Sequence, residues 1–172
     1  MNLSFEICTL EHLDMLTEIS RNTFITAFEK HNDPDDFKNY MDSVFNKASI
    51  KAELLKPNVM FYFVYLDEEL VGYFKLNEND AQNEQFEKPS IELERIYVLE
   101  TFQGKQIGKQ MLLKTIDIAK SKGVAFLWLG VWKKNLSAFR FYERYDFKTF
   151  DSHPYYIGKD KQTDWLMKLD FI

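Results

Sequence analysis

The segment TFQGKQIGKQML, residues 101–112, separates an apolar, strand-like run from an apolar, helix-like run. The chain has only six glycines, and two of them, Gly104 and Gly108, lie in this segment. Glycine between a strand and a helix lets a ligand approach the free backbone N–H groups and the positive end of the helix dipole. The segment therefore predicts a strand–loop–helix unit that binds an anion.

The charges of the segment favour the same interpretation. No acidic residue occurs in residues 103–116, whereas Lys105, Lys109 and Lys114 are present. Each lysine in a first helical turn opposes the helix dipole by about 0.3–1 kcal/mol, and a bound anion would reverse that cost. A solvated basic patch on an ordinary β–α loop explains the same residues without a ligand, so both interpretations remain open at this point.

Two other phosphate-binding motifs fit the segment poorly. The dinucleotide fingerprint G-x-G-x-x-G is absent, and a P-loop needs four residues between its glycines and a Ser or Thr after its lysine. Three residues separate Gly104 from Gly108, and Gln110 follows Lys109. The segment is therefore a poor match for NAD or ATP.

Strand-like and helix-like runs alternate along the rest of the chain. Strands are predicted at residues 3–10, 60–66, 70–76, 91–98, 125–132, 147–157 and 163–171, and a polar loop at 77–90. Helical regions are predicted from residue 10 with a break before Thr23, from Asp33–Pro34 to Pro57, and at about 107–122 and 136–145. This order predicts an α/β (α+β) fold with one crossover helix between two parallel strands.

The composition indicates one folded domain, residues 1–172, because 172 residues with 45% hydrophobic side chains are enough for one full core. No run approaches the roughly 18 apolar residues of a membrane helix, and Glu6, Glu11 and Asp14 interrupt any signal peptide. The single cysteine, Cys8, lies in an apolar run and is expected in the core. We therefore expect a cytoplasmic protein that neither enters a membrane nor forms an internal disulfide.

The charged residues restrict the partners. A net charge of −5 argues against a nucleic-acid partner and is compatible with a cationic small substrate. His12, His31 and His153 lie far apart, with no cysteine or carboxylate at ligand spacing, so we expect no metal site.

The strand IELERIYV, residues 91–98, changes the parity of its apolar positions. Ile91 and Leu93 share one face, whereas Ile96 and Val98 share the other. A β-bulge near residues 94–96 would cause this change and would leave backbone N–H groups unpaired. A strand that is buried on both faces would show the same pattern with no bulge.

At this point the sequence resembles the GCN5-related N-acetyltransferase (GNAT) family, whose pyrophosphate loop reads [Gln/Arg]-x-x-Gly-x-[Gly/Ala]. Gln103, Gln106 and Gly108 occupy those places, although the family prefers glycine at the position of Gln106. A residue with a Cβ resists the positive φ of such a position. The segment NLSAFRFYERYDF, residues 135–147, resembles the family's N-x-x-A-x-x-F-Y-x-x-x-G-F, with Asp146 in the place of the glycine.

Along nearly its whole length, the amino-acid sequence looks closest to those of the PaiA-type spermidine/spermine N-acetyltransferases. The segments that carry this likeness are TFITAFEKHN, NDAQNE, ELERIYV, LWLGVWKKN and QTDWLM. The resemblance implies a GNAT-type mixed, mostly antiparallel sheet flanked by helices, with a splayed pair of parallel central strands. It also implies acetyl-CoA as cosubstrate, with its pantetheine arm in the gap between those strands.

By this resemblance, the residues that contact acetyl-CoA would come from the strand, the loop and the following helices. They are Ile96, Tyr97, Val98, Gln103, Gly104, Lys105, Gln106, Ile107, Gly108, Lys109, Asn135 and Tyr142. A backbone N–H of the strand would stabilise the thioester oxyanion. Asn135 also fits an N-cap of the helix that follows it, with or without a ligand.

Amide formation needs a proton acceptor for the amine and a proton donor for the leaving thiolate. Glu94, beside the expected bulge, is our first candidate for the base and Glu92 the second, although either could instead pair with Arg95 or a lysine. Tyr142 is the family's candidate for the acid, and without the motif it would be interpreted as core.

The resemblance places the acceptor between the first helices and the loop at 77–90. Residues there and near the C-terminus that could attract or cover a polycation are Glu29, Glu78, Asp80, Glu84, Tyr155, Tyr156 and Trp165. We expect acetyl transfer to a primary amine of a small polycation such as spermidine. The alternatives are a CoA-binding sensor without turnover and an acetyltransferase of protein amines. An exposed edge strand near the C-terminus could support a homodimer.

Overall fold

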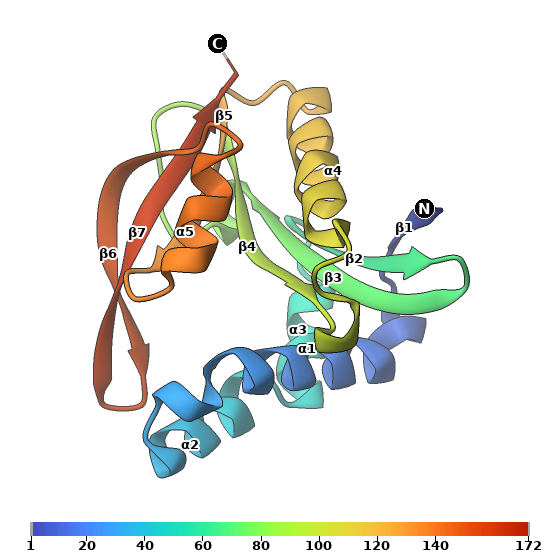
Figure 1. The fold of residues 1–172 in the computed structure, drawn as a ribbon, viewed down its shortest axis with the longest axis vertical. Helices are drawn as coiled ribbons and strands as arrows, with labels where there is room; N and C mark the ends of the chain where they lie inside the picture. Colours follow the sequence, from blue (N-terminus) through green and yellow to red (C-terminus); the bar gives the residue numbers. More distant parts are fainter. Residues whose placement is uncertain (1, 172) are drawn as a thin grey trace.

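A computed structural model describes residues 2–171 (Figure 1). In this range one sheet has the strand order β1-β2-β3-β4-β5-β7-β6. Its strands are β1 (Leu3–Ile7), β2 (Val59–Leu66), β3 (Glu69–Glu78), β4 (Ser90–Val98), β5 (Phe126–Trp132), β6 (Lys148–Ile157) and β7 (Asp160–Asp170). The α-helices are α1 (Leu13–Phe28), α2 (Pro34–Val44), α3 (Lys47–Leu54), α4 (Ile107–Ser121) and α5 (Leu136–Glu143). All strand pairs are antiparallel except β4–β5, which is parallel and connected through α4. The predicted α+β fold is confirmed.

The helices pack on the sheet in two groups. Apolar side chains of α4 and α5, such as Met111 and Tyr142, share one core cluster with strand residues such as Phe74. Those of α1, α2 and α3 share another cluster, which includes Cys8 as expected. Figure 1 shows α1 running across the lower part of the molecule, with β4 seen between α5 and α4 above it.

Two helical boundaries differ from the prediction. The predicted break before Thr23 is wrong, because Thr23 is buried within α1 and its hydroxyl donates to the carbonyl of Ile19 at 2.7 Å. The region after Asp33 contains two helices, because Asn46 caps α3 by accepting a hydrogen bond from the backbone N–H of Ser49. Asp33 caps α2 ahead of Pro34, as its sequence indicates.

The central strands diverge. β4 and β5 pair only at their first residues, where Ser90, Ile91 and Glu92 lie beside residues 126–128. On the other side of β4, the register passes from Lys75–Arg95 to Leu76–Leu93, so that Glu94 is an extra residue. The predicted β-bulge and the predicted splay are both confirmed.

The polar loop between β3 and β4 is anchored over the sheet. The side-chain oxygen of Gln82 accepts hydrogen bonds from the indole N–H of Trp128 at 2.8 Å and from the hydroxyl of Ser90 at 2.9 Å. The ring of Phe86 packs edge-on against Trp128 and Phe150. The loop therefore holds a fixed position beside β5 and β6. No helix within residues 2–171 is long and apolar enough to cross a membrane.

Candidate active site

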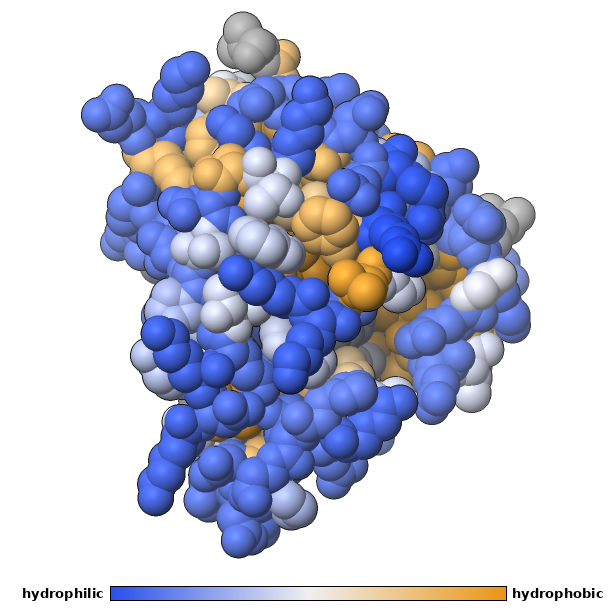
Figure 2. Space-filling model, turned by 60° about the vertical axis from the view of Figure 1, so that its left-hand side comes forward, coloured by the Kyte–Doolittle hydropathy of each residue, from blue (hydrophilic) through white to orange (hydrophobic). Residues whose placement is uncertain are grey.

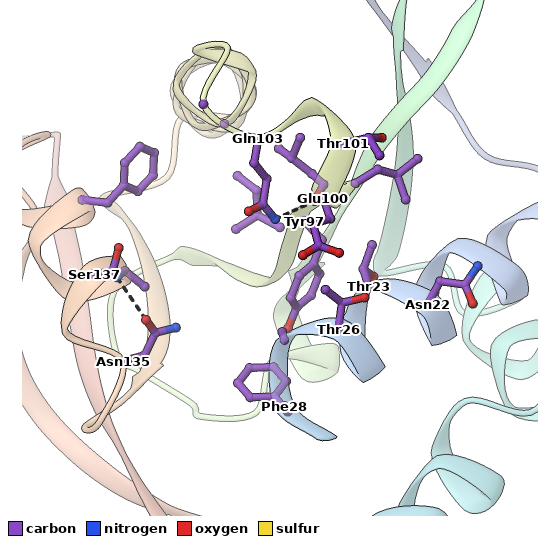
Figure 3. Close-up of a pocket in the computed structure, with 18 of the residues that line it drawn as sticks. Asn22, Thr23, Thr26, Phe28, Tyr97, Glu100, Thr101, Gln103, Asn135 and Ser137 are labelled. Atoms are coloured by element: carbon purple, nitrogen blue, oxygen red, sulfur yellow. Dashed lines mark hydrogen bonds between the residues drawn. The ribbon is translucent and has the colours of Figure 1, made fainter. Parts of the chain in front are cut away.

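A cleft of about 810 Å³ opens where β4 and β5 diverge. Its walls come from α1, from β4, from the loop that precedes α4, and from α5, as Figure 3 shows for the labelled residues. Predicted cofactor residues that line it are Ile96, Tyr97, Val98, Gln103, Gly104, Gly108, Asn135 and Tyr142. Asn22, Thr26 and Phe28 of α1 form the opposite wall; the first helices were expected beside the acceptor, but these residues were not named among the cofactor contacts. Polar side chains (blue) cover most of the face in Figure 2, with apolar side chains (orange) visible beside a hollow near its centre.

The edge of β4 that faces the cleft is free. Ile96, Tyr97 and Val98 pair with β3 on one side, while the described residues of β5 provide no strand partner on the other. An unpaired strand edge presents N–H and C=O groups that an extended ligand can bind as an additional strand. This geometry suits a chain with amide groups, such as the pantetheine arm of CoA.

The loop before α4 forms the outer part of the cleft. A hollow of about 610 Å³ there is lined by Gln103, Gly104, Gln106, Ile107, Gly108 and Lys109, all predicted, and by Arg144, which was not. Among the described residues no side chain caps the first turn of α4. The N–H groups of that turn therefore remain available to an anion. Of the predicted loop residues, Lys105 lines neither hollow, and its Nζ lies 5.1 Å from the ring centre of Phe102.

Gln106 adopts the conformation that its Cβ disfavours. Its φ is 66° and its ψ 10°, in the left-handed region, and Asp146 likewise has a φ of 66°. The left-handed conformation costs about 1–2 kcal/mol for a residue with a Cβ. Both residues thus keep the turn that glycine forms in the family pattern, at the expense of some stability.

Two predicted residues on α5 have structural roles at the cleft. The side-chain oxygen of Asn135 accepts a hydrogen bond from the N–H of Ala138 at 3.2 Å and caps the helix. Tyr142 is buried against Phe147, with ring centres 5.8 Å apart. Burial raises the pKa of Tyr142, so that the phenol keeps its proton at neutral pH.

A first chamber of about 320 Å³ adjoins the cleft, with Phe28 and Tyr97 lining both. Its other aromatic side chains are Phe24, Tyr40, Trp132 and Tyr155. The hydroxyls of Tyr40 and Tyr155 contact each other and join α2 to β6. Aromatic walls of this kind suit an alkyl chain or a cation.

A cluster of two acidic and two basic groups lies at or beneath the wall of the first chamber, which Asp164 also lines. Lys75 forms ion pairs with both Glu53 and Glu94. The guanidinium of Arg95 lies 4.5 Å from the ring centre of Phe45 and 3.8 Å from Glu53, and its Nη1 has no partner among the described residues. The two carboxylates and two cations balance in charge.

Glu94 lines the chamber, but its surroundings make it a weak base. Burial opposes its ionisation, yet the charges of Lys75 and Arg95 and hydrogen bonds from Lys75 and Asn77 lower its pKa to about 2. A carboxylate with so low a pKa accepts a proton poorly at neutral pH. The geometry thus favours the alternative role for Glu94, pairing with a lysine, over that of general base.

A second chamber of about 310 Å³ continues from the first. Asn83, Glu94, Gly130, Tyr155 and Asp164 line both chambers, while Glu84, Glu92, His153 and Pro154 line only the second. Glu92 accepts hydrogen bonds from the backbone N–H and side-chain amide of Asn83, each at 2.9 Å, and from Asn77 at 3.0 Å. Burial, with the nearby charge of Glu94, raises the pKa of Glu92.

Among the other residues expected around the acceptor, the structure brings only Glu84 and Tyr155 to the chambers. Glu78 pairs with Lys122, and Asp80 accepts a hydrogen bond from Asn58. The ring centre of Trp165 lies 3.9 Å from Nζ of Lys133. Glu29 and Tyr156 are exposed. Chamber residues that were not among the expected acceptor residues include Glu53, Asn83, Gly130, His153 and Asp164. Asn83, Gly130 and Asp164 lie within the quoted segments NDAQNE, LWLGVWKKN and QTDWLM, whereas Glu53 and His153 lie outside the quoted segments.

Known proteins share this sequence pattern and fold. The model of the acetyltransferase (GNAT) family matches residues 13–147. An uncharacterized N-acetyltransferase in the pepI 3' region of Lactobacillus delbrueckii subsp. lactis is 37% identical over 150 residues, 87% of each chain. Spermidine N(1)-acetyltransferase of Thermoplasma acidophilum is 24% identical over 158 residues, 88% of this chain and 92% of that protein.

Among solved structures, PaiA N-acetyltransferase from Thermoplasma acidophilum in complex with coenzyme A has a TM-score of 0.78 at 22% identity. The match covers 99% of this chain and 100% of that chain, so the two proteins share the whole fold. The chain therefore belongs to the acetyltransferase (GNAT) family and is an acetyl-CoA-dependent N-acetyltransferase.

Proposed function

We propose that the protein transfers the acetyl group of acetyl-CoA directly to a primary amine of a small polycation such as spermidine or spermine. The observation that carries the proposal is the series of three adjoining cavities, namely the cleft, an aromatic chamber and a chamber lined by Glu84, Glu92 and Asp164. Aliphatic segments suit the aromatic walls, and ammonium groups suit the carboxylates. The names of two relatives, spermidine N(1)-acetyltransferase of Thermoplasma acidophilum and spermine/spermidine N(1)-acetyltransferase of Bacillus subtilis, support the same class of acceptor.

For the cosubstrate, the residues of the chain would act at two places. The free edge of β4 at Ile96, Tyr97 and Val98 would bind the pantetheine amides, and one backbone N–H there would stabilise the oxyanion. The first turn of α4, with Lys109 and Arg144 beside it, would hold the phosphates. Asn135 lines the same cleft while it caps α5.

The first chamber would prepare the amine. Lys75 and Arg95 pair with Glu53 and Glu94, so these two carboxylates stabilise the ammonium form of the reacting nitrogen little, and the remaining carboxylate, Asp164, lies where the two chambers meet. Desolvation among aromatic rings lowers the pKa of an amine and favours its neutral form. Glu92, with its raised pKa, is a better final acceptor for the released proton than Glu94 is.

The neutral amine would then attack the carbonyl carbon of the thioester, the C–N bond would form, and the C–S bond would break. Tyr142 lines the cleft and keeps its proton at neutral pH, so it would protonate the leaving thiolate. The proton that the amine loses returns to the phenolate through solvent or Glu92, and the enzyme is restored.

Free-thiol release from acetyl-CoA by the purified protein, with and without spermidine, tests the proposal. We expect release that depends on spermidine and a product heavier than spermidine by one acetyl group in mass spectrometry. Absence of release with spermidine and spermine, together with CoA binding in a titration, would overturn the proposal. That result would favour a CoA-binding protein without turnover on polyamines.

A further inference from the structure

His153 lies in the second chamber between two carboxylates. Its Nδ1 is 2.9 Å from Oε1 of Glu84, and its Nε2 is 3.7 Å from Oδ2 of Asp164. Glu84 belongs to the anchored loop before β4, His153 to β6 and Asp164 to β7. The protein thus places a titratable nitrogen base at the point where an ammonium group of a substrate would bind.

The charged groups around His153 leave an excess of negative charge. Glu84 faces the chamber from the loop, Glu92 and Glu94 from β4, and Asp164 from β7. Lys75 neutralises Glu94 from beneath, so Glu84, Glu92 and Asp164 remain with His153 as the single basic side chain that lines the chamber. Two carboxylates at the imidazole, with that of Glu92 in the same chamber, can hold a further cation when the imidazole is neutral.

Gly130 provides independent evidence that the chambers receive a ligand. It is an exposed residue within β5, and it lines both chambers at their junction. A Cβ at this position would lie 3.2 Å from Oδ2 of Asp164 and 3.6 Å from Nε2 of His153. Its φ lies outside the left-handed region, so the backbone conformation does not require glycine. Glycine within a strand weakens it and often marks a place where a ligand approaches closely.

We propose that the second chamber binds the non-reacting ammonium group of the acceptor, which displaces His153 from Glu84 and Asp164, while Gly130 keeps the passage between the chambers open. This inference rests on the proposed function and extends it. The first chamber, where Lys75 and Arg95 balance Glu53 and Glu94, receives the reacting amine, and the more acidic second chamber receives the distant cation. The acceptor is therefore bound in one direction, and an amine with a second cationic nitrogen is preferred over a monoamine.

The displacement makes binding of the acceptor depend on pH. The carboxylate of Asp164, together with that of Glu84, raises the pKa of His153 above its ordinary value. Below this pKa the imidazolium pairs with both carboxylates and competes with the substrate. Above it the imidazole is neutral, and the carboxylates are free for the ammonium. The KM for a polyamine should therefore fall, as pH rises through the pKa of His153, by more than the KM for a monoamine does.

Steady-state acetyl transfer to spermidine and to n-butylamine, by wild type and by matched variants, tests the inference. Glu84→Gln and Asp164→Asn should each raise the KM for spermidine by about tenfold or more, the loss expected for one charge-assisted hydrogen bond. The kinetics of Glu84→Gln with n-butylamine should change by less than about twofold, because Glu84 lines only the second chamber. Glu87→Gln, an exposed carboxylate of the same loop, is the control and should match wild type with both amines.

Two further variants separate the site from general structural damage. Gly130→Ala should raise the KM for spermidine while its melting temperature stays equal or rises, because alanine stiffens a strand relative to glycine. His153→Gln should remove the difference in pH dependence between spermidine and n-butylamine. Equal effects of Glu84→Gln and Asp164→Asn on both amines, or no effect on either, would overturn the inference.

The same data distinguish failure of the inference from failure of the proposed function. If the wild-type protein prefers spermidine and the variants keep this preference, only the inference is contradicted. Wild-type protein that acetylates n-butylamine as well as spermidine contradicts both.

Discussion

Lys75 and Glu94 form a buried ion pair beneath the first chamber, at the residue where β4 bulges. The bulge inserts Glu94 as an extra residue and places its carboxylate against the ammonium of Lys75 from β3. The same ammonium reaches Glu53 of α3, so that one cation joins the sheet to the helical layer. This pair neutralises Glu94, so that the first chamber carries less negative charge than the second.

The ion pair predicts how stability depends on pH. The pKa of Glu94 is about 2 in the fold and 4.5 ordinarily, so its ionised form stabilises the protein above about pH 4.5. That contribution is lost as pH falls toward 2. Urea unfolding should give wild type a constant advantage in unfolding free energy over Glu94→Gln above about pH 5, and a shrinking one below pH 4.5. An advantage that stays constant from pH 7 to pH 3 would contradict the pairing, and Glu87→Gln serves as the exposed control.

Gly108→Asp should weaken CoA binding by about tenfold or more, or ~1.4 kcal/mol. The Cβ position of Gly108 is open, with only Val98 near it at 3.9 Å, so the fold can accept a side chain there. The new carboxylate would occupy the cleft and repel phosphates at the first turn of α4. Calorimetric titration with CoA measures the effect. Ser121→Asp puts the same charge at the other end of α4 and should leave the affinity unchanged, whereas equal affinities for all three proteins would exclude the phosphate site.

Tyr142→Phe should lower kcat by about 10²-fold or more, the usual size of a general-acid contribution. CoA affinity should change little, because the ring that packs against Phe147 is retained. Single-turnover thiol release measures the step, and a titration measures the affinity. Tyr145→Phe, one helical turn further along the chain, is the matched control. Unaltered thiol release in Tyr142→Phe would show that Tyr142 only packs in the core.

Gln106→Gly should stabilise the fold by about 0.5–1 kcal/mol. The substitution relieves about 1–2 kcal/mol of backbone strain, which exceeds the free-energy cost of ordering the more flexible glycine when the chain folds. The backbone at Gln106 already has a φ of 66°, so CoA affinity should not fall. Urea unfolding and a CoA titration measure the two quantities. A variant less stable than wild type would mean that the Gln106 side chain stabilises the loop through its own contacts.

The sequence predicts local features of the site better than contacts between distant segments. The bulge at Glu94 follows from the change of parity among the apolar residues of β4, and the cap of α5 follows from Asn135 itself. The break before Thr23 was wrong because a buried threonine satisfies its hydroxyl within its own helix. Thr23 therefore costs α1 no unsatisfied polar group.

The acceptor chambers were largely missed because their residues come from segments far apart in the chain. Glu53 belongs to α3, Asn83 to the loop before β4, and Asp164 to β7, and no periodicity connects them. His153 was considered only as a metal ligand, since its neighbours depend on the pairing of β6 with β7 and of β7 with β5. Gly130 lies within the quoted segment LWLGVWKKN, but no role was predicted for it, because its importance lies in the space above it.

The specificity of acetyl transfer decides whether the acceptor is a small polycation. The measurement is kcat/KM for spermidine at saturating acetyl-CoA, compared with kcat/KM for a lysine-containing peptide and a peptide with a free N-terminus. We predict that kcat/KM for spermidine is higher by about 10²-fold or more, because only a flexible polycation can place its reacting amine in the first chamber and a second cationic nitrogen in the second. A kcat/KM for either peptide that equals or exceeds the value for spermidine would contradict the account.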